Sequence, residues 1–444
     1  MDIRAVLVAM CGCLLAFGAA MVLSDLGDQG LGPMVLAVVL SLALARQRRH
    51  VTSASRAVLV VAATALAGGV GWLLAGPAPV IGDIAFVVVM AGTIALRRFG
   101  PRWTGIGVVA MMPMIGLLVV PVVPRGVVGV PILLATAIVT VGCVLGVRTV
   151  AERTGFLAVD TPRPTPPVRP GTGLRASDRM ALQTALGLAA AFVAGRLLFG
   201  SHWSWVVLTT FVVASGARGR GDVLHRGMLR MLGAGAGTVL ASLLATAFPP
   251  ATPGPIVAIF VVLAVATWLR PRSYAWWAAG VTAVVALLSD FLGQDAAAVL
   301  PIRLVAIAVG GVIAVAVAWF VLPVRTSAVV RRRVADALAA LQDVLAAEPK
   351  GLDTARARFA HTLEQLEEIA PPLRTHRRIR PRAAHAADTV DALLACAAPV
   401  DAMPEVPPGA AARLVGELRR GLRDPAGHLS PRFAELPARL APVP

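Results

Sequence analysis

Three arginines lie within or at the ends of strongly apolar stretches of the chain: Arg196, Arg230 and Arg303. A guanidinium near hydrocarbon raises the free energy unless it meets water, an acidic partner or a ligand. Each of the three is therefore a candidate contact for an anionic small molecule. Structural roles are the alternative, because Arg230 suits the charged end of a membrane segment, and Arg196 and Arg303 can extend toward lipid head groups.

Aromatic and hydroxyl side chains accompany these arginines. Trp203 and Trp205 begin an apolar segment that also contains Thr209, and Thr267 lies in a later one. An indole can stack on an aromatic ring, and a threonine hydroxyl can hydrogen-bond to a polar group. We predict that these four residues line a substrate path together with the arginines. An interfacial aromatic belt is the alternative role of the tryptophans.

Proton transfer along such a path requires an acid or a histidine that titrates within it. Asp83, Asp290, Asp295 and His202 fall near equivalent ends of their segments. Only Asp290 closes a long apolar run, so Asp290 is the proton-coupling candidate. The other three are expected to be solvated loop groups.

Three glycines follow Arg230 at alternate positions: Gly233, Gly235 and Gly237. They lack the preceding strand, the G-x-G-x-x-G spacing and the lysine of phosphate-binding loops. A four-residue spacing of small residues favours close helix packing, which we predict for Gly233, Gly237 and Gly310. No segment gathers the residues of a catalytic or metal site. The sequence predicts no enzyme activity, no metal site and no cofactor, and it disfavours an ATP-driven pump.

The elements that carry these residues are apolar and suited to a membrane. Hydrophobic residues make up 57% of the chain, the mean hydropathy is +0.78 and 15% of residues are charged, against about 25% in ordinary soluble domains. A spanning helix needs roughly 20 apolar residues. The candidates are 5–23, 31–45, 57–75, 81–96, 103–121, 130–147, 180–198, 203–216, 231–248, 256–269, 274–290 and 301–323. We predict an all-α integral membrane protein with about 12 transmembrane helices, or ten or eleven if the shortest segments do not cross.

Arginine-rich loops alternate with loops free of lysine and arginine. Arg46, Arg97 and Arg148 mark basic loops, whereas 24–32 and 76–83 have no basic residue. The positive-inside rule then places both termini in the cytoplasm. Each block of six segments returns to the same side, so we predict two parallel six-helix repeats. A shift of 174 positions aligns Arg46 with Arg220, Arg56 with Arg230 and Thr93 with Thr267.

Composition divides the chain into four regions. Residues 1–148 form a first, degenerate membrane repeat, 149–179 a Pro-rich cytoplasmic linker, 180–324 the second repeat and 325–444 a cytoplasmic helical tail. Apolar periodicity in the tail predicts helices near 327–347, 352–370, 383–397 and 409–422. The basic run Arg374–Arg382 is expected to be a loop, and the end from Pro425 is expected to be disordered.

The net charge of +17 does not indicate nucleic-acid binding. Residues 1–324 hold 23 Lys/Arg and 10 Asp/Glu, so most of the excess lies in loops between membrane segments. Arg331, Arg332 and Arg333 follow the last segment and favour anionic lipid head groups. Membrane lipids are therefore expected partners, and nucleic acid is not.

A family pattern begins at the short tryptophan-containing segment. Trp203 and Thr209 are followed by Arg226-x3-Arg230-x2-Gly233-x3-Gly237, and the last segment runs from Arg303 through Gly310-Gly311 to Trp319-Phe-Val-Leu-Pro323. This pattern resembles the fusaric acid resistance and aromatic acid exporter family, often called FUSC-like, over about 180–325. The resemblance implies a multi-pass bacterial inner-membrane protein that exports aromatic carboxylic acids or related toxic organic anions with the proton gradient.

The leading hypothesis is therefore an exporter of a small organic anion, with a homodimer as a candidate assembly. One alternative is a channel that conducts organic anions without proton dependence. Another is a membrane scaffold that transports nothing and recruits envelope proteins through its tail. The scaffold hypothesis predicts that Arg196 and Arg303 tolerate substitution, whereas disruption of the tail abolishes function.

Overall fold

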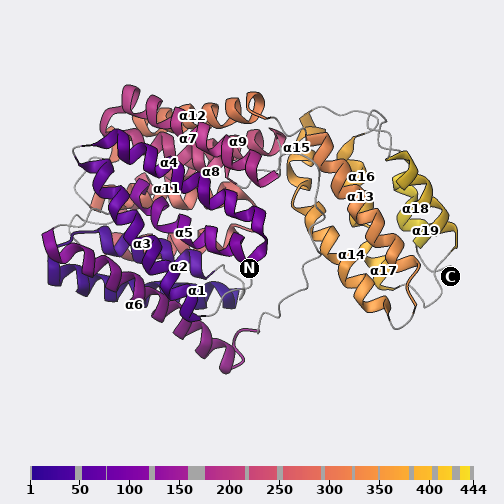
Figure 1. The fold of residues 1–444 in the computed structure, drawn as a ribbon, viewed down its shortest axis with the longest axis horizontal. Coiled ribbons are helices and arrows are strands. Elements are labelled where there is room, and N and C mark those ends of the chain that lie inside the picture. Colours follow the sequence, from indigo (N-terminus) through magenta and orange to yellow (C-terminus); the bar gives the residue numbers. More distant parts are fainter. Residues whose placement is uncertain are drawn as a thin grey trace. The chain divides into compact units, whose positions relative to one another are not determined.

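The computed structural model describes residues 3–45, 53–76, 78–119, 126–158, 176–215, 220–247, 254–291, 296–322, 326–348, 351–379, 385–402, 409–422 and 431–440. All regular structure in these residues is helical (Figure 1). The chain divides into two compact units. The membrane unit comprises Met1–Ser215 and Arg226–Leu322, and the tail unit comprises Gly216–His225 and Pro323–Pro444.

Twelve helices follow one another along the apolar part of the described chain. They are α1 (Ile3–Gly27), α2 (Gly32–Leu44), α3 (Ser53–Ala75), α4 (Pro79–Ala95), α5 (Pro101–Val119), α6 (Gly126–Arg153), α7 (Ala176–Phe199), α8 (Trp203–Ala214), α9 (Arg220–Ala247), α10 (Gly254–Leu269), α11 (Tyr274–Phe291) and α12 (Ala296–Phe320). Short 3₁₀ turns, η1 (Leu96–Phe99) and η2 (Gly200–His202), follow α4 and α7. Each of the twelve predicted segments lies largely within one of these helices.

Eight helical stretches of the described chain are long and apolar enough to cross a membrane, with α7 and α8 counted as one stretch. The shorter apolar helices are α2, α10 and α11. Large apolar side chains such as Leu197 and Phe320 are exposed on the outside of the bundle, as expected where lipid replaces water. The chain is therefore a multi-pass membrane protein. A crossing by all twelve helices stays a prediction.

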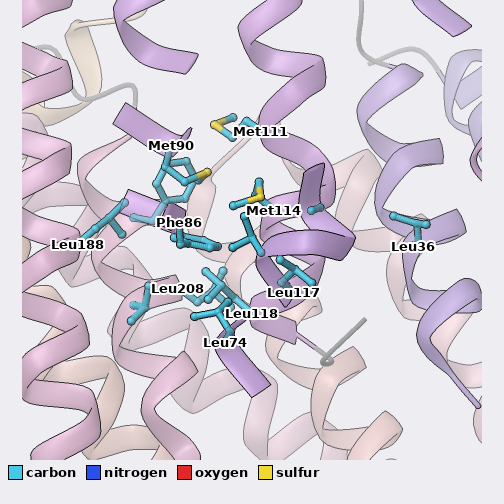
Figure 2. Close-up of a cluster of buried hydrophobic side chains, with 14 of the residues drawn as sticks. Leu36, Leu74, Phe86, Met90, Met111, Met114, Leu117, Leu118, Leu188 and Leu208 are labelled. Atoms are coloured by element: carbon cyan, nitrogen blue, oxygen red, sulfur yellow. The ribbon is translucent and has the colours of Figure 1, made fainter. Parts of the chain in front are cut away.

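Aromatic and methionine side chains fill the centre of the membrane unit. Figure 2 shows Phe86 and Met90 of α4 beside Met114 of α5, and all three are fully buried. Phe86 meets Phe192 of α7 edge to face, with ring centroids 5.5 Å apart. Phe192 in turn lies 5.2 Å from the ring of Trp203. These rings connect a helix of the first predicted repeat to helices of the second.

Corresponding helices pack alike in the two predicted repeats. Helices α1, α2 and α6 contact one another, and so do α7, α8 and α12. A Cβ atom on Gly107 of α5 would lie 2.3 Å from the carbonyl oxygen of Thr93, and one on Gly280 of α11 would lie 2.2 Å from Cβ of Ala266. Gly280 follows Gly107, and Ala266 follows Thr93, by nearly the same number of residues as separates the aligned arginines. The packing is consistent with duplication, which stays a prediction.

The tail unit has its own apolar core. Its helices are α13 (Thr326–Leu345), α14 (Leu352–Glu367), α15 (Ala370–Ile379), α16 (Ala386–Leu394), α17 (Ala397–Asp401), α18 (Gly409–Gly421), the 3₁₀ turn η4 (Pro431–Glu435) and α19 (Leu436–Leu440). Val334, Leu338, Phe359 and Leu366 are buried at its centre. The four helices predicted from periodicity are all present. The cytoplasmic location of this unit stays a prediction.

Two expectations about the tail are wrong. The basic run from Arg374 is helical as far as Ile379, and residues 380–384 lie outside the described residues. Phe433, Leu436 and Leu440 are buried in the core, so the described part of the C-terminal end is ordered. Three apolar anchors fix this short segment even though its composition is rich in proline.

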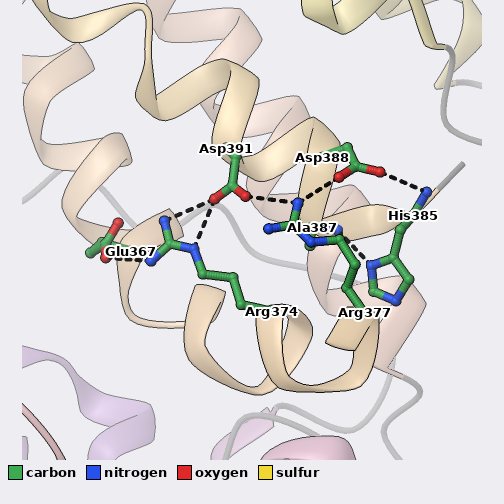
Figure 3. A network of polar contacts seen from close by, with 7 residues as sticks. All are labelled: Glu367, Arg374, Arg377, His385, Ala387, Asp388 and Asp391. Atoms are coloured by element: carbon green, nitrogen blue, oxygen red, sulfur yellow. Dashed lines mark hydrogen bonds and ion pairs between the residues drawn. The ribbon is translucent and has the colours of Figure 1, made fainter. Parts of the chain in front are cut away.

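Ion pairs explain why the basic run is a helix (Figure 3). Arg374 contacts Glu367 of α14 at 3.1 Å and Asp391 of α16 at 2.8 Å. Arg377 contacts Asp388 at 2.5 Å and Asp391 at 3.0 Å. The hydrogen bond that Arg377 donates to Asp388 is the main reason that the pKa of Arg377 is raised. Acidic partners on two other helices therefore hold α15 in place.

Candidate functional site

Arg303 lies inside the membrane unit rather than at its lipid-facing surface. It follows Pro301 in the first turns of α12, and only 4% of the residue is exposed. Its Nη2 donates a hydrogen bond to the carbonyl oxygen of Thr282 on α11 at 3.2 Å. Its guanidinium carbon lies 4.1 Å from the ring centroid of Trp205 on α8, a cation–π arrangement. The alternative role at lipid head groups is therefore wrong for Arg303.

Arg230 is a second buried cation of the same region. It lies on α9, is 3% exposed, and is near enough to Arg303 for the two positive charges to repel each other. It also acts electrostatically on the hydroxyl of Tyr274 at the start of α11. The Nε atoms of Arg230 and Arg303 are buried without a hydrogen-bond partner among the described residues. A buried charge without a partner is unfavourable, so this pair is suited to an anionic ligand.

Hydroxyl groups on the same helices are also unpaired. Within the described chain, Thr209 Oγ1 on α8, Thr282 Oγ1 on α11 and the Tyr274 hydroxyl are buried and have no hydrogen-bond partner. Thr209 lies one turn after Trp205 and therefore on the same face of α8. Helices α8, α9, α11 and α12 thus contribute two cations, an indole and several free hydroxyl donors to the interior of the bundle.

Close helix contacts hold these four helices together. A Cβ atom on Gly233 would lie 2.6 Å from the carbonyl oxygen of Ala275, and one on Gly237 would lie 2.2 Å from that of Ala279. Both contacts join α9 to α11. At Gly310 of α12, a Cβ atom would lie 2.6 Å from the carbonyl oxygen of Val206 on α8. The three glycines predicted to pack helices therefore lie where two backbones approach, which only a residue without a side chain permits.

Arg196 has a different environment. Its Nε donates to Oδ2 of Asp83 at 2.6 Å, and its Nη2 donates to Oδ1 at 2.7 Å. Its guanidinium also lies 4.7 Å from the ring centroid of Trp203. Asp83 lies on α4 and Arg196 on α7, so the pair joins the two predicted repeats. An acidic side chain of the protein already occupies the position that the sequence assigned to an anionic substrate.

Removing either charge of this pair is expected to destabilise the membrane unit. A two-pronged pair with side chains 29% and 14% exposed is expected to show a coupling energy of roughly 1–3 kcal/mol. Thermal unfolding in detergent of Asp83→Asn, Arg196→Gln and the double variant measures this energy. The double variant should lose less stability than the sum of the single losses. Additive losses would show that the contact contributes nothing.

No contact in the described residues joins the remaining candidates to Arg230 or Arg303, and some candidates lie outside the described residues. Thr267 of α10 is 2% exposed, and its hydroxyl has no hydrogen-bond partner among the described residues. Asp290 belongs to α11, but its side chain is outside the described residues, and so is Asp295. His202 lies within hydrogen-bond distance of Ser201, at 3.2 Å. The structure therefore assembles Arg230, Arg303 and Trp205, and pairs Arg196 with Trp203 and Asp83.

Sequence reasoning missed Thr282, Tyr274 and the role of Asp83. Thr282 is a hydroxyl residue in the middle of an apolar segment, and Tyr274 is the only tyrosine of the chain, so both gave a weak signal. The first repeat lacks most residues of the site, although Arg56 aligns with Arg230. A shift of 174 positions places Gly129 at the position of Arg303, Leu31 at Trp205 and Val108 at Thr282. Only the second repeat therefore carries this cluster.

The site lies in a multi-pass membrane bundle and contains two buried arginines without an acidic partner among the described residues. Residues 184–317 match the family model described as fusaric acid resistance protein-like. This segment, which includes Trp205, Arg230 and Arg303, is similar to that family, and the family resemblance inferred from its motifs is confirmed. Comparisons with curated proteins and with solved structures give no match.

Proposed function

We propose that this protein is an inner-membrane transporter that exports aromatic carboxylic acids or related organic anions and uses the proton gradient. The buried pair of Arg230 and Arg303, with free Nε donors, is the observation that carries the proposal. The description of the matching family refers to resistance to fusaric acid, which is a pyridine carboxylic acid. An aromatic carboxylate such as fusaric acid suits a cationic site that contains an aromatic side chain.

Binding follows from the charges of the site. A carboxylate accepts strong, charge-assisted hydrogen bonds from a guanidinium. These bonds gain strength in the low dielectric of the bundle interior and relieve the repulsion between the two arginines. The hydroxyls of Thr209, Thr282 and Tyr274 can donate further hydrogen bonds, because none has a partner among the described residues. Trp205 supplies an aromatic surface, one region of which contacts Arg303.

Uptake into inside-out vesicles tests the proposal. Vesicles that contain the protein are expected to accumulate benzoate or picolinate above the outside concentration when the vesicle interior is acidic, and dissipation of the gradient should abolish accumulation. Equilibration that does not depend on the gradient would instead establish a channel. If no aromatic or other organic anion in the panel moves, the transporter proposal is rejected in favour of the scaffold. Vesicles without the protein provide the background.

A further inference from the structure

The site for the proposed substrate has more positive charge than one carboxylate can neutralise. Arg230 and Arg303 are both buried, and a guanidinium keeps its proton in proteins. Neither arginine has an acidic partner among the described residues. The acidic side chains of the membrane unit with known ion pairs contact other arginines: Asp83 contacts Arg196, Asp178 contacts Arg98 and Glu152 contacts Arg148. Among the described residues nothing neutralises these two buried charges, so the site is suited to a ligand that carries negative charge.

A ligand with one negative group would leave the other cation uncompensated. Burial of an unpaired charge is strongly unfavourable, and the cost falls when a second charge is supplied within hydrogen-bond distance. Arg303 is positioned by the carbonyl of Thr282 and by the ring of Trp205. Arg230 lies on the same face of α9 as Gly237, and Gly237 packs against Thr282. The two guanidinium groups therefore offer hydrogen-bond donors from two different helices, α12 and α9, so each can bind its own negative group.

We infer that the site binds a dianion, an aromatic dicarboxylate in chemical class, with one carboxylate on Arg303 and the other on Arg230. This inference rests on the proposed function, because it assigns the substrate class of the same site. Hydroxyl donors at Thr282 and at Tyr274, both on α11, can complete the coordination of the two carboxylates. Monocarboxylates bind to the same site more weakly.

Isothermal titration of the purified full-length protein in detergent tests the inference. The probes are benzoate, which carries one charge at neutral pH, and the three phthalate isomers, which carry two charges with different separations. At constant ionic strength, at least one isomer should bind roughly 10- to 100-fold more tightly than benzoate, because it adds one charge-assisted contact. The isomer that binds best reports the separation of the two guanidiniums.

Substitution of each arginine tests which residue binds the second carboxylate of the ligand. Arg230→Gln should bring the affinity for the best isomer to within about threefold of that for benzoate, whereas Arg303→Gln should weaken both. Arg272→Gln, which removes an exposed arginine stacked on Trp268, is the charge-matched control and should change neither. Thermal unfolding shows whether each variant is folded.

The outcomes separate the inference from the proposed function. If no isomer binds more tightly than benzoate, or if the preference persists in Arg230→Gln, the dianion inference is wrong. In that case, gradient-driven uptake of benzoate would leave the transporter proposal intact. If no carboxylate binds and none is transported, both are rejected. Asp290→Asn adds a further check: an increased preference for the dianion in this variant would show that Asp290 supplies the negative charge, and would overturn the inference.

Discussion

Replacing Arg303 with glutamine is expected to lower transport of an aromatic carboxylate by about 100-fold, because loss of one partner of a buried charge pair costs roughly 2–5 kcal/mol. Glutamine keeps most of the volume and can still donate to the carbonyl of Thr282, so the effect reports charge. Arg303→Lys should retain intermediate activity, because a lysine keeps the charge but lacks the planar fork and its stacking on Trp205.

Initial uptake rates in inside-out vesicles, normalised to the amount of folded protein, measure this effect. Arg272→Gln again serves as the control, because it removes the same charge from an exposed position. The variant proteins must also elute as single species in detergent, which excludes misfolding. Transport by Arg303→Gln within twofold of the wild-type rate would show that the substrate does not contact this arginine.

Replacing Gly237 with leucine is expected to prevent assembly of the bundle. The first side-chain carbon would lie 2.2 Å from the carbonyl oxygen of Ala279 and 2.9 Å from Cβ of Thr282, so α9 and α11 would have to separate. Overpacking inside a helix bundle typically lowers the free energy of unfolding by about 1–3 kcal/mol. A clash with the backbone is expected to reach or exceed the upper end of this range. Separation would also move Arg230 away from Arg303.

Gly235 provides the matched control on the same helix. A Cβ atom there meets nothing within 4 Å, so Gly235→Leu should fold and unfold at the wild-type temperature. Yield of monodisperse protein and the midpoint of thermal unfolding in detergent compare the two variants. Equal behaviour of Gly235→Leu and Gly237→Leu would contradict the close packing of α9 against α11.

Hydropathy was sufficient to locate the membrane helices. An apolar segment surrounded by lipid must satisfy its backbone hydrogen bonds internally, so each run becomes a helix whatever its neighbours are. Even 203–216, which is too short to cross by length alone, proved to be α8. The count of crossings is harder to predict, because a short helix such as α2 or α8 can end inside the bundle when other helices shield its ends.

Partners of individual side chains could be predicted less well. The sequence marked Arg230 and Arg303 as unusual because charge is costly in apolar segments, but nothing local indicated that they meet. The pairing of Arg196 with Asp83 joins positions 113 residues apart. In the tail, α15 escaped prediction because its partners, Glu367 and Asp391, lie on other helices. Packing between helices decides all of these contacts, and a single sequence records it only weakly.

The contact at Gly310, together with that at Gly237, groups the residues of the site by helix pair. The α-carbon of Gly310 leaves no space for a side chain against Val206, so α8 and α12 pack backbone to backbone, and Gly237 joins α9 to α11 in the same way. The four helices therefore form two closely packed pairs. Trp205 and Arg303 belong to the pair of α8 and α12, and Arg230 and Thr282 belong to the pair of α9 and α11. A ligand that contacts both arginines, as inferred above, would therefore join the two helix pairs.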